Sequence, residues 1–351
     1  MADLPPDTRT LNPLPLADFT TLRIGGPADR LVIAHTEEDL IEAVRQADCD
    51  AVPLLIVSGG SNMLVADEGF PGTAVVVATG GIAAQVADGG VDLRVAAGEP
   101  WDGLVAHTVS RGWSGLEMLS GIPGLAGAAP VQNIGAYGAD VSLVITGIRV
   151  FDRRLNQVAT FTPTECRFGY RTSVFKQEYG RYIVLSVDVR LAVDEVSSPI
   201  AYAELARHLD VDLGTRAPLA DVRKAVLELR RSKGMVLNEA DHDTWSAGSF
   251  FTNPIVDAAA AAALPGDAPR FPQPDGTVKT SAAWLIDHAG FHKGYGTGPA
   301  ALSTKHVLAL TNRGGATAED ILDLARTIRD GVRTLYGITL TPEPVFVGLS
   351  L

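Results

Sequence analysis

The segment from Gly121 to Gly138 constrains the fold most, because it is long, uncharged and interrupted by glycine and proline. It holds five glycines and two prolines, together with Gln132 and Asn133. A bilayer span of this length would need a continuous apolar helix, which these residues interrupt. Glycine lets the backbone approach a ligand closely, because it has no Cβ and adopts positive φ. The segment therefore predicts either the wall of a bound cofactor or an ordinary loop.

Composition and charge exclude several classes of protein. A chain of 351 residues predicts two or three domains. The net charge of −12 argues against nucleic-acid binding, because no basic field would neutralise phosphates. Cys49 and Cys166 lie far apart, so we expect no metal site; a disulfide stays open, but reduced thiols fit better. Residues 1–7 lack the basic start and apolar run of a signal peptide, which predicts a cytoplasmic protein with no membrane association.

Hydrophobic periodicity predicts mixed helices and strands. Thr36 and Asp39 have the spacing of a capping box, as do Thr317 and Asp320 before the last helix. The expected strands cover residues 31–34, 53–57 and 74–78, much of 145–193, and residues 340 and 345–347. The expected helices cover residues 37–44, 101–111, 219–231, 258–263, 282–288 and 318–335. A domain boundary is expected near residues 205–220.

Four further features suit chemistry, although each has a simpler structural explanation. Ser58–Asn62 follows an expected buried strand and could cradle a phosphate with backbone N–H groups, although a plain turn is favoured. It lacks the P-loop and dinucleotide-binding patterns. Arg171 could hold a carboxylate or form a surface ion pair. Ser249 lies outside any GxSxG elbow and could be a turn residue, and Glu343 lies between two prolines that force extended backbone.

Taken together and in order, these segments resemble the UDP-N-acetylenolpyruvoylglucosamine reductase family. The resemblance runs from about residue 19 to residue 347, and the matching pieces are 21–26, 59–62, 97–99, 115–117, 122–124, 130–138, 166–171, 248–254 and 342–343. It implies an α+β fold, in which an FAD-binding fold of the vanillyl-alcohol-oxidase/PCMH type, made of two α+β subdomains, precedes a separate α+β substrate-binding domain. The implied division is residues 1–80, with 325–351 returning to them, then 81–215, then 216–324.

The resemblance also implies a reaction, with non-covalently bound FAD as cofactor and NADPH as hydride donor. UDP-N-acetylglucosamine enolpyruvate would be reduced to UDP-N-acetylmuramate, a peptidoglycan precursor, with ping-pong kinetics. Negative charge would develop on the substrate as an enolate, which needs positive charge or hydrogen bonds. Arg171 would supply the charge, and Glu343, protonated through a raised pKa, would donate to the carboxylate. Ser249 would protonate the carbanion, which is basic enough to accept a proton from a weak acid.

The same resemblance implies which residues contact the ligands. The implied cofactor-binding residues are Ser58, Gly59, Gly60, Ser61, Asn62, Met63, Leu64, Ile122, Pro123, Gly124, Gly127, Gln132, Asn133, Ile134, Gly135 and Ala136. The implied substrate-binding residues are Tyr137, Tyr170, Tyr202, Arg230, Lys233, Asn253, Lys293 and His306. Tyr202 lies in a segment similar to the extra tyrosine-bearing loop of one type within the family, although it could instead be a packed aromatic at a helix start.

This sequence departs from the enterobacterial form of the family at several positions. The segment after Lys233 is longer and carries the acids Glu239, Asp241 and Asp243, and Val345 stands where that form has a basic residue. His306 stands where that form has a glutamine. These differences concern the details of flavin and substrate contacts rather than the reaction.

Two other functions remain to be compared with this one. A flavin-dependent oxidase of the same superfamily would share the fold, but many such enzymes anchor flavin through His or Cys, and the glycine-rich turns here contain neither. A non-catalytic nucleotide-sugar-binding protein would not need the combination of Arg171, Ser249 and Glu343, so the presence of all three argues against this function.

Overall fold

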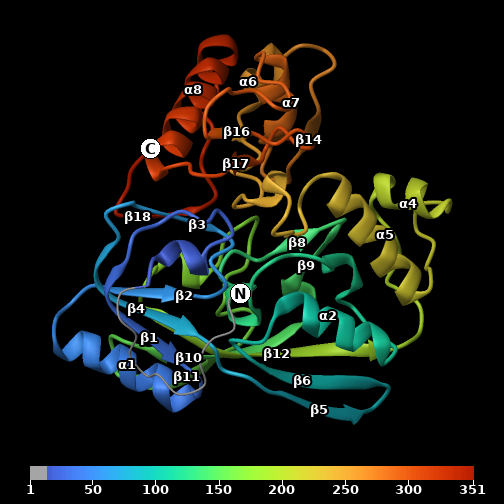
Figure 1. Cartoon of the computed structure of the whole chain (residues 1–351). Helices are drawn as coiled ribbons and strands as arrows, with labels where there is room; N and C mark the ends of the chain where they lie inside the picture. Colours follow the sequence, from blue (N-terminus) through green and yellow to red (C-terminus); the bar gives the residue numbers. More distant parts are fainter. Residues whose placement is uncertain (1–13) are drawn as a thin grey trace. The chain divides into compact units, whose positions relative to one another are not determined.

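The computed structural model describes residues 14–351, which form two compact units. Unit 1 contains Ala28–Gly59 and Pro71–Ser232, and unit 2 contains Pro15–Pro27, Gly60–Phe70 and Lys233–Leu351 (Figure 1). The predicted three-part division stays a prediction. Residues 1–7, which underlie the expectation of no signal peptide, lie outside the described part of the chain.

The described part of unit 1 contains two larger sheets and the two-stranded hairpin β8–β9. The smaller has the order β1–β4–β2, with β2 parallel to β4, and the larger has the antiparallel order β11–β10–β12–β6–β5, with β7 beside β12. The strands of unit 1 are β1 (Ala28–Ala34), β2 (Leu54–Val57), β4 (Phe70–Val77), β5 (Ile82–Ala87), β6 (Gly90–Ala96), β7 (Trp113–Ser114), β8 (Gly135–Ala136), β9 (Ala139–Asp140), β10 (Ile145–Asp152), β11 (Gln157–Phe161) and β12 (Tyr182–Val193). Its helices are α1 (Glu37–Cys49), α2 (Trp101–Ser110), η2 (Glu117–Leu119), η3 (Ala126–Ala128), η4 (Val141–Leu143), α3 (Val174–Gln177), α4 (Ala203–Leu209) and α5 (Leu219–Ser232).

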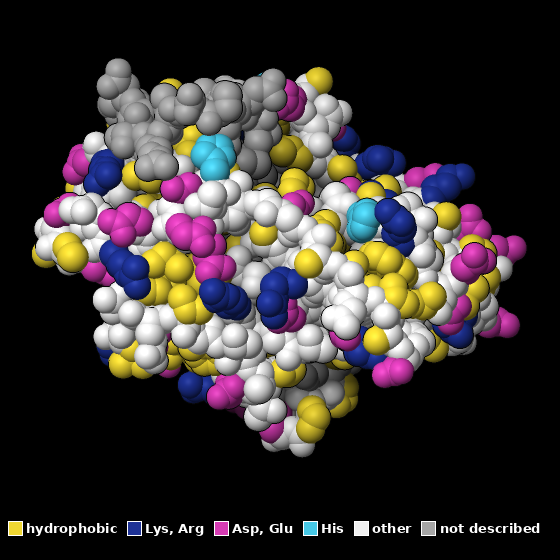
Figure 2. Space-filling model, turned by 90° about the horizontal axis from the view of Figure 1, so that it is seen from below, with side chains coloured by type: hydrophobic (Ala, Val, Ile, Leu, Met, Phe, Trp, Pro, Cys, Tyr) yellow, Lys and Arg dark blue, Asp and Glu magenta, His cyan; other side chains and the backbone are white. Residues whose placement is uncertain are grey.

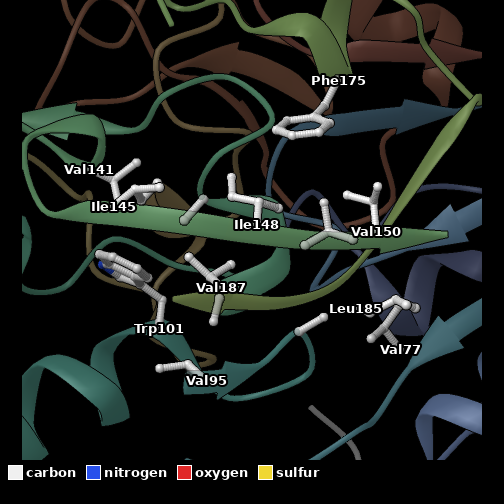
Figure 3. Close-up of a cluster of buried hydrophobic side chains, with 14 of the residues drawn as sticks. Val77, Val95, Trp101, Val141, Ile145, Ile148, Val150, Phe175, Leu185 and Val187 are labelled. Carbon is white, nitrogen blue, oxygen red and sulfur yellow. The ribbon is translucent and has the colours of Figure 1, made fainter. Parts of the chain in front are cut away.

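The main core of unit 1 lies on the central strands of the larger sheet. Figure 3 shows Ile148 and Val150 of β10 near Val187 of β12, with Trp101 of α2 close by. The Trp101 indole N–H donates to the carbonyl of Leu119 at 3.0 Å, so this large side chain is buried with its polar atom satisfied. This hydrogen bond also connects α2 to the residues just before the uncharged segment.

Unit 2 is built from short elements and one long helix. Its strand β3 (Met63–Val65) pairs in parallel with β18 (Val345–Val347), although the two are far apart in sequence. Its other strands are β13 (Ile255–Val256), β14 (Arg270–Pro272), β15 (Val278–Thr280), β16 (Ala300–Leu302) and β17 (Leu310–Asn312). Its helices are η1 (Leu16–Phe19), η5 (His242–Thr244), α6 (Ala258–Ala263), α7 (Ala282–His288) and α8 (Ala318–Tyr336). A core of leucine, isoleucine and phenylalanine lies beneath α7 and α8.

Most elements expected from periodicity are confirmed, including both capping boxes. The expected strand at Leu340 is wrong, because Leu340 is buried in irregular backbone before β18. Pro342 and Pro344 lack the N–H groups that a paired strand there would need. Within residues 14–351 there is no helix with the length and apolarity needed to cross a bilayer.

Figure 2 shows a face on which acidic and basic side chains are interspersed without a continuous basic area.

Cys49 is exposed and Cys166 is buried, and they are not bonded to each other. Burial raises the pKa of the Cys166 thiol to about 12, so this thiol is unreactive.

We predict that Thr317→Ala destabilises α8 by about 1 kcal/mol, because the hydroxyl of Thr317 accepts a hydrogen bond from the N–H of Asp320 in the capping box. Urea unfolding of both proteins measures the difference. Thr327→Ala, on an exposed position of the same helix, is the matched control and should change stability by less than about 0.5 kcal/mol. An equal effect of both substitutions would contradict the role given to the cap.

Candidate functional site

The first part of the uncharged segment follows the end of β6 through backbone hydrogen bonds. The N–H of Gly127 donates to the carbonyl of Ala97, and the N–H of Ala126 donates to that of Glu99, both at 2.8 Å. A Cβ built on Gly127 would lie 2.6 Å from the Cβ of Ala97, so a larger residue would force the two backbones apart. The segment is therefore a fixed wall rather than an exposed loop.

The second part of the segment forms a tight hairpin. Strands β8 and β9 are joined by Tyr137 and Gly138, which have φ of 51° and 86°. Positive φ at both central residues is the conformation of a type I′ turn, which matches the twist of paired strands. Glycine satisfies this requirement at Gly138, whereas Tyr137 adopts a conformation that is uncommon for its residue type. The backbone thus fixes Tyr137 at the tip of the hairpin.

The expected phosphate cradle begins in unit 1 with Ser58 and Gly59. Gly59 has φ of 72°, and a Cβ built on it would lie 2.8 Å from the Cα of Gly124 in the uncharged segment. The Ser58 hydroxyl is buried and has no hydrogen-bond partner among residues 14–351. Buried polar atoms normally have a partner, so this hydroxyl indicates a ligand atom beside it. The two predicted cofactor segments thus approach each other, and only glycine fits at the approach.

The remainder of the cradle belongs to unit 2. A Cβ built on Gly60 would lie 1.9 Å from the carbonyl oxygen of Phe19, and the carbonyl of Gly60 accepts from the N–H of Thr21 at 3.2 Å. Asn62 precedes β3, and its carbonyl accepts from the N–H of Val345 at 2.9 Å. Consecutive positive φ values at Gly59 and Gly60 can turn several N–H groups toward one anion.

Arg171 packs against the base of the hairpin in unit 1. Its guanidinium donates to the carbonyl of Gly135 at 2.9 Å and to that of Asn133 at 3.3 Å. The side chain of Asn133 in turn donates to the carbonyl of Gly169 at 3.2 Å. The Arg171 backbone has φ of 52°, and its guanidinium lies 5.7 Å from the ring centre of Tyr170. Neutral carbonyl partners orient the guanidinium without neutralising its charge.

Three of the predicted substrate-binding residues come together in unit 1. The rings of Tyr137 and Tyr202 meet edge to face, with centroids 5.5 Å apart. Burial raises the pKa of Tyr137 to about 12, although the nearby positive charge of Arg230 opposes this effect, so the phenol stays protonated. Burial lowers the pKa of Arg230, while Tyr137 and Asp102 favour its charge and Arg171 opposes it. Arg230 therefore contributes positive charge to the surroundings of Tyr137.

In unit 2, backbone contacts connect Glu343 to the segment that carries Ser249. The N–H of Glu343 donates at 2.8 Å to the carbonyl of Phe250, the residue after Ser249. The neighbouring residues Phe251 and Pro342 form a bridge, and the side-chain amide of Asn62 donates to the Glu343 carbonyl at 3.3 Å. Gly248, with φ of 70°, sets the direction of the chain before Ser249.

The other predicted substrate residues have different environments. The side-chain oxygen of Asn253 accepts from the N–H of Ala282 at 2.9 Å, so it fixes the start of α7. Lys293 is exposed in the glycine-rich stretch after α7. Lys233 and His306 are half-buried.

The additional acids after Lys233 form contacts that the sequence did not indicate. Asp243 is buried and accepts from Arg313 at 2.6 Å and from the N–H of Thr304 at 2.9 Å. Asp241 pairs with Lys305, and exposed Glu239 pairs with Arg23 at 3.2 Å. These acids hold the longer segment in place by ion pairs within unit 2. Their partners lie more than 60 residues away, so no local sequence pattern indicates these contacts.

Comparisons with known proteins agree over nearly the whole chain. Residues 28–155 match the model of the FAD binding domain, and residues 239–347 match that of the UDP-N-acetylenolpyruvoylglucosamine reductase C-terminal domain. The reductase of this name from Cutibacterium acnes is 54% identical, with 96% of this chain and 90% of that protein covered. The one from Salinispora arenicola is 52% identical, with both chains fully covered. The crystal structure of the enzyme from Thermus caldophilus has a TM-score of 0.66 at 27% identity and covers 96% of this chain and 98% of that one.

These matches confirm the predicted fold class, an α+β FAD-binding fold with a separate C-terminal domain. The residues of unit 1 fit FAD, because Gly59 leaves no room for a side chain against Gly124 and the Ser58 hydroxyl needs a partner.

We predict that Gly59→Ala lowers FAD occupancy, because its Cβ would collide with the backbone of Gly124 at a positive φ. Gly89→Ala is the matched control, since Gly89 has the same φ of 72° but nothing within 4 Å of a built Cβ. Absorbance near 450 nm per protein should fall at least tenfold for Gly59→Ala and stay unchanged for Gly89→Ala. Equal flavin content in both variants would show that the close approach does not matter for the cofactor.

We predict that Asp243→Asn lowers stability at pH 7 by about 2 kcal/mol, the scale of a hydrogen bond to a charged group. Burial raises the pKa of Asp243, but hydrogen bonds from Thr304 and Arg313 outweigh it, so the pKa is lowered overall. A lowered pKa stabilises the fold above the unfolded-state value near 4, and this contribution is lost as pH falls through the folded-state value. Urea unfolding between pH 3 and pH 7 should show the two proteins converging at acid pH. A constant difference across this range would contradict the assignment.

Proposed function

Because the chain belongs to the UDP-N-acetylenolpyruvoylglucosamine reductase family, we propose that Arg171, Ser249 and Glu343 carry its reaction. The chain is an FAD-containing oxidoreductase that reduces UDP-N-acetylglucosamine enolpyruvate to UDP-N-acetylmuramate in the synthesis of peptidoglycan precursors. A nicotinamide cofactor supplies the hydride, and we propose that it is NADPH. The reduction of an enolpyruvyl group proceeds through an enolate. Arginine can stabilise its negative charge, serine can donate a proton to it, and protonated glutamate can donate a hydrogen bond to its carboxylate.

The cofactor-binding residues supply backbone and one hydroxyl rather than charged side chains. We propose that Ser58 to Leu64 hold the diphosphate of FAD and that Ile122 to Ala136 lie along its ring system. The support is the close approach of Gly59 to Gly124 and the buried hydroxyl of Ser58. FAD held by these residues would supply the chemistry of hydride transfer between the nicotinamide and the terminal enolpyruvyl carbon.

Arg171 is proposed to stabilise the negative charge of the enolate and its carboxylate. A preorganised cation is effective because it does not need to reorient when charge develops. The carbonyls of Gly135 and Asn133 supply this preorganisation, since they fix the guanidinium while leaving its net charge unchanged. Lysine at this position would lose the planar fork that makes two oriented hydrogen bonds at once.

Ser249 is proposed to protonate the carbon that carries the negative charge. Its backbone is fixed by Gly248 on one side and by the Phe250–Leu308 hydrogen bond of 2.8 Å on the other. Glu343 is held close to this segment, because its N–H donates to the carbonyl of Phe250, the residue after Ser249. We propose that Glu343 acts in its protonated form and donates to the substrate carboxylate.

Tyr137, Tyr202 and Arg230 are proposed to bind the nucleotide-sugar part of the substrate. The edge-to-face contact of the two rings and the adjacent positive charge of Arg230 support this assignment. Tyr170, Lys233, Lys293 and His306 are further proposed contacts. Asn253 can contribute its amide N–H groups, while its oxygen accepts from the N–H of Ala282 at the start of α7.

The domain division and the cellular location stay proposals. The chain would divide functionally into residues 1–80 with 325–351, 81–215 and 216–324. Its location would be cytoplasmic, where nucleotide sugars and NADPH are available.

We predict that Ser249→Ala leaves flavin reduction by NADPH unchanged but slows the following reduction of the enolpyruvyl substrate by about 10²–10⁴-fold, the usual effect of losing a proton donor. Stopped-flow absorbance separates the two steps, since flavin bleaches in the first and recovers in the second. Recovery at the normal rate would rule out Ser249 as the donor.

Thr252→Ala is the control for this experiment, because Thr252 lies three residues further on and its hydroxyl donates to the carbonyl of Thr341. It should leave both steps within about twofold of the parent enzyme. Failure of the parent protein to bind flavin, or to bleach with NADPH, would overturn the proposed function as a whole.

A further inference from the structure

Asp102, in the first turn of α2, makes three hydrogen bonds that join separate parts of unit 1. One oxygen accepts from the N–H of Gly121 and from Arg223, both at 2.6 Å, and the other accepts from Arg223 at 2.8 Å. The Arg223 side chain is 16% exposed and the Asp102 side chain 41% exposed, so the pair is partly shielded from water and its directionality comes from the bidentate geometry. Burial raises the pKa of Asp102, but Arg223 and the Gly121 N–H outweigh it and lower the pKa overall, so the carboxylate is charged at neutral pH. This residue therefore links α2, the start of the uncharged segment and α5.

Arg223 and Arg230 lie on the same face of α5. They are seven residues apart, which is close to two turns of an α-helix. The apolar face of α5, with Val222 and Val226, packs on Met118 and on α4. Apolar packing is non-directional, so it permits small rotations and shifts along the helix axis. A bidentate ion pair is directional, so the Asp102–Arg223 pair fixes the rotation and register of α5.

The position of α5 determines what surrounds Tyr137. Arg230 contributes positive charge to Tyr137, and Asp102 contributes negative charge to Arg230. Helix α4 is connected to α5 by the contact of His208 with Glu228 at 2.9 Å. Tyr202, at the start of α4, meets the ring of Tyr137. A shift of α5 would therefore move Arg230 and, through α4, Tyr202.

We propose that Asp102 and Arg223 are a positioning pair that keeps the charge of Arg230 near Tyr137 and the ring of Tyr202 against that of Tyr137, so that the enzyme binds its nucleotide-sugar substrate in one geometry. This inference rests on the proposed function, because it takes Tyr202 and Arg230 as substrate contacts. The pair touches no reacting atom in this account. Its effect is on substrate affinity, whereas the reduction of the flavin does not depend on it.

The test is a double-mutant cycle with Asp102→Asn, Arg223→Gln and the double variant. Asparagine keeps an acceptor for the Gly121 N–H but removes the charge. We expect each single variant to raise KM for the enolpyruvyl substrate about tenfold, since misplacement of about 1 Å can cost up to about 10²-fold. The double variant should show little further change, because both substitutions break the same pair. The rate of flavin bleaching at saturating NADPH should stay within about twofold.

Asp188→Asn is the matched control, because Asp188 makes a bidentate pair with Arg94, at 2.8 and 2.9 Å, on the larger sheet of the same unit. It should leave KM unchanged. A purely structural role of Asp102 would lower the amount of active enzyme and both half-reactions together, without changing KM. Arg223→Lys, which keeps the charge but loses the fork, should recover only part of the affinity.

Tyr202→Ala separates this inference from the function on which it rests. Tyr202 is 43% exposed, so its truncation should not impair folding. If Tyr202→Ala does not raise KM, Tyr202 is not a substrate contact and the premise of this inference is wrong. If Tyr202→Ala raises KM but Asp102→Asn and Arg223→Gln do not, the positioning pair is refuted while the function stands.

Discussion

The close approach of backbone to backbone in unit 1 is the constraint on which the proposed cofactor wall depends. Gly59 meets Gly124, and Gly127 meets Ala97, at distances where a Cβ would collide. Because no side chain intervenes, the groups that line this region are N–H and C=O dipoles held in fixed directions. Such dipoles are effective toward a ligand because they need no reorganisation when it binds. The absence of charge in residues 121–138 follows from the same constraint, since a charged side chain here would be buried without a partner.

Unit 2 uses pairing of distant segments for a similar purpose. Parallel pairing of β3 with β18 fixes Asn62 beside Glu343, and the N–H of Glu343 fixes the chain next to Ser249. Three segments that are separate in sequence thus share one set of backbone hydrogen bonds. A side chain mounted on such a ladder has a well-defined direction even where its own contacts are few. Reactive groups placed in this way need little support from neighbouring side chains.

The sequence predicted local structure well where the signal was local. Capping boxes at Thr36 and Thr317 and the amphipathic stripe of α5 depend on residues within a few positions of each other. The strand expected at Leu340 failed because tertiary burial, rather than pairing, accounts for that apolar side chain. The edge-to-face pair of Tyr137 and Tyr202 was expected only as two separate substrate contacts, because periodicity carries no information about which distant residues meet. The capping role of Asn253 and the ion pairs of Asp241 and Asp243 were missed for the same reason.

The pairing of β3 with β18 also affects how the protein is made. Unit 2 is assembled from segments that are distant in sequence, and within the described residues 14–351 β3 pairs with residues 345–347. During synthesis, β3 emerges early and remains an unpaired edge while about 280 further residues are added. An exposed edge of this kind favours pairing with other chains. Formation of unit 2 therefore has to wait until residues 345–347 can pair with β3, whereas unit 1 includes no residue beyond Ser232 and can begin to fold earlier.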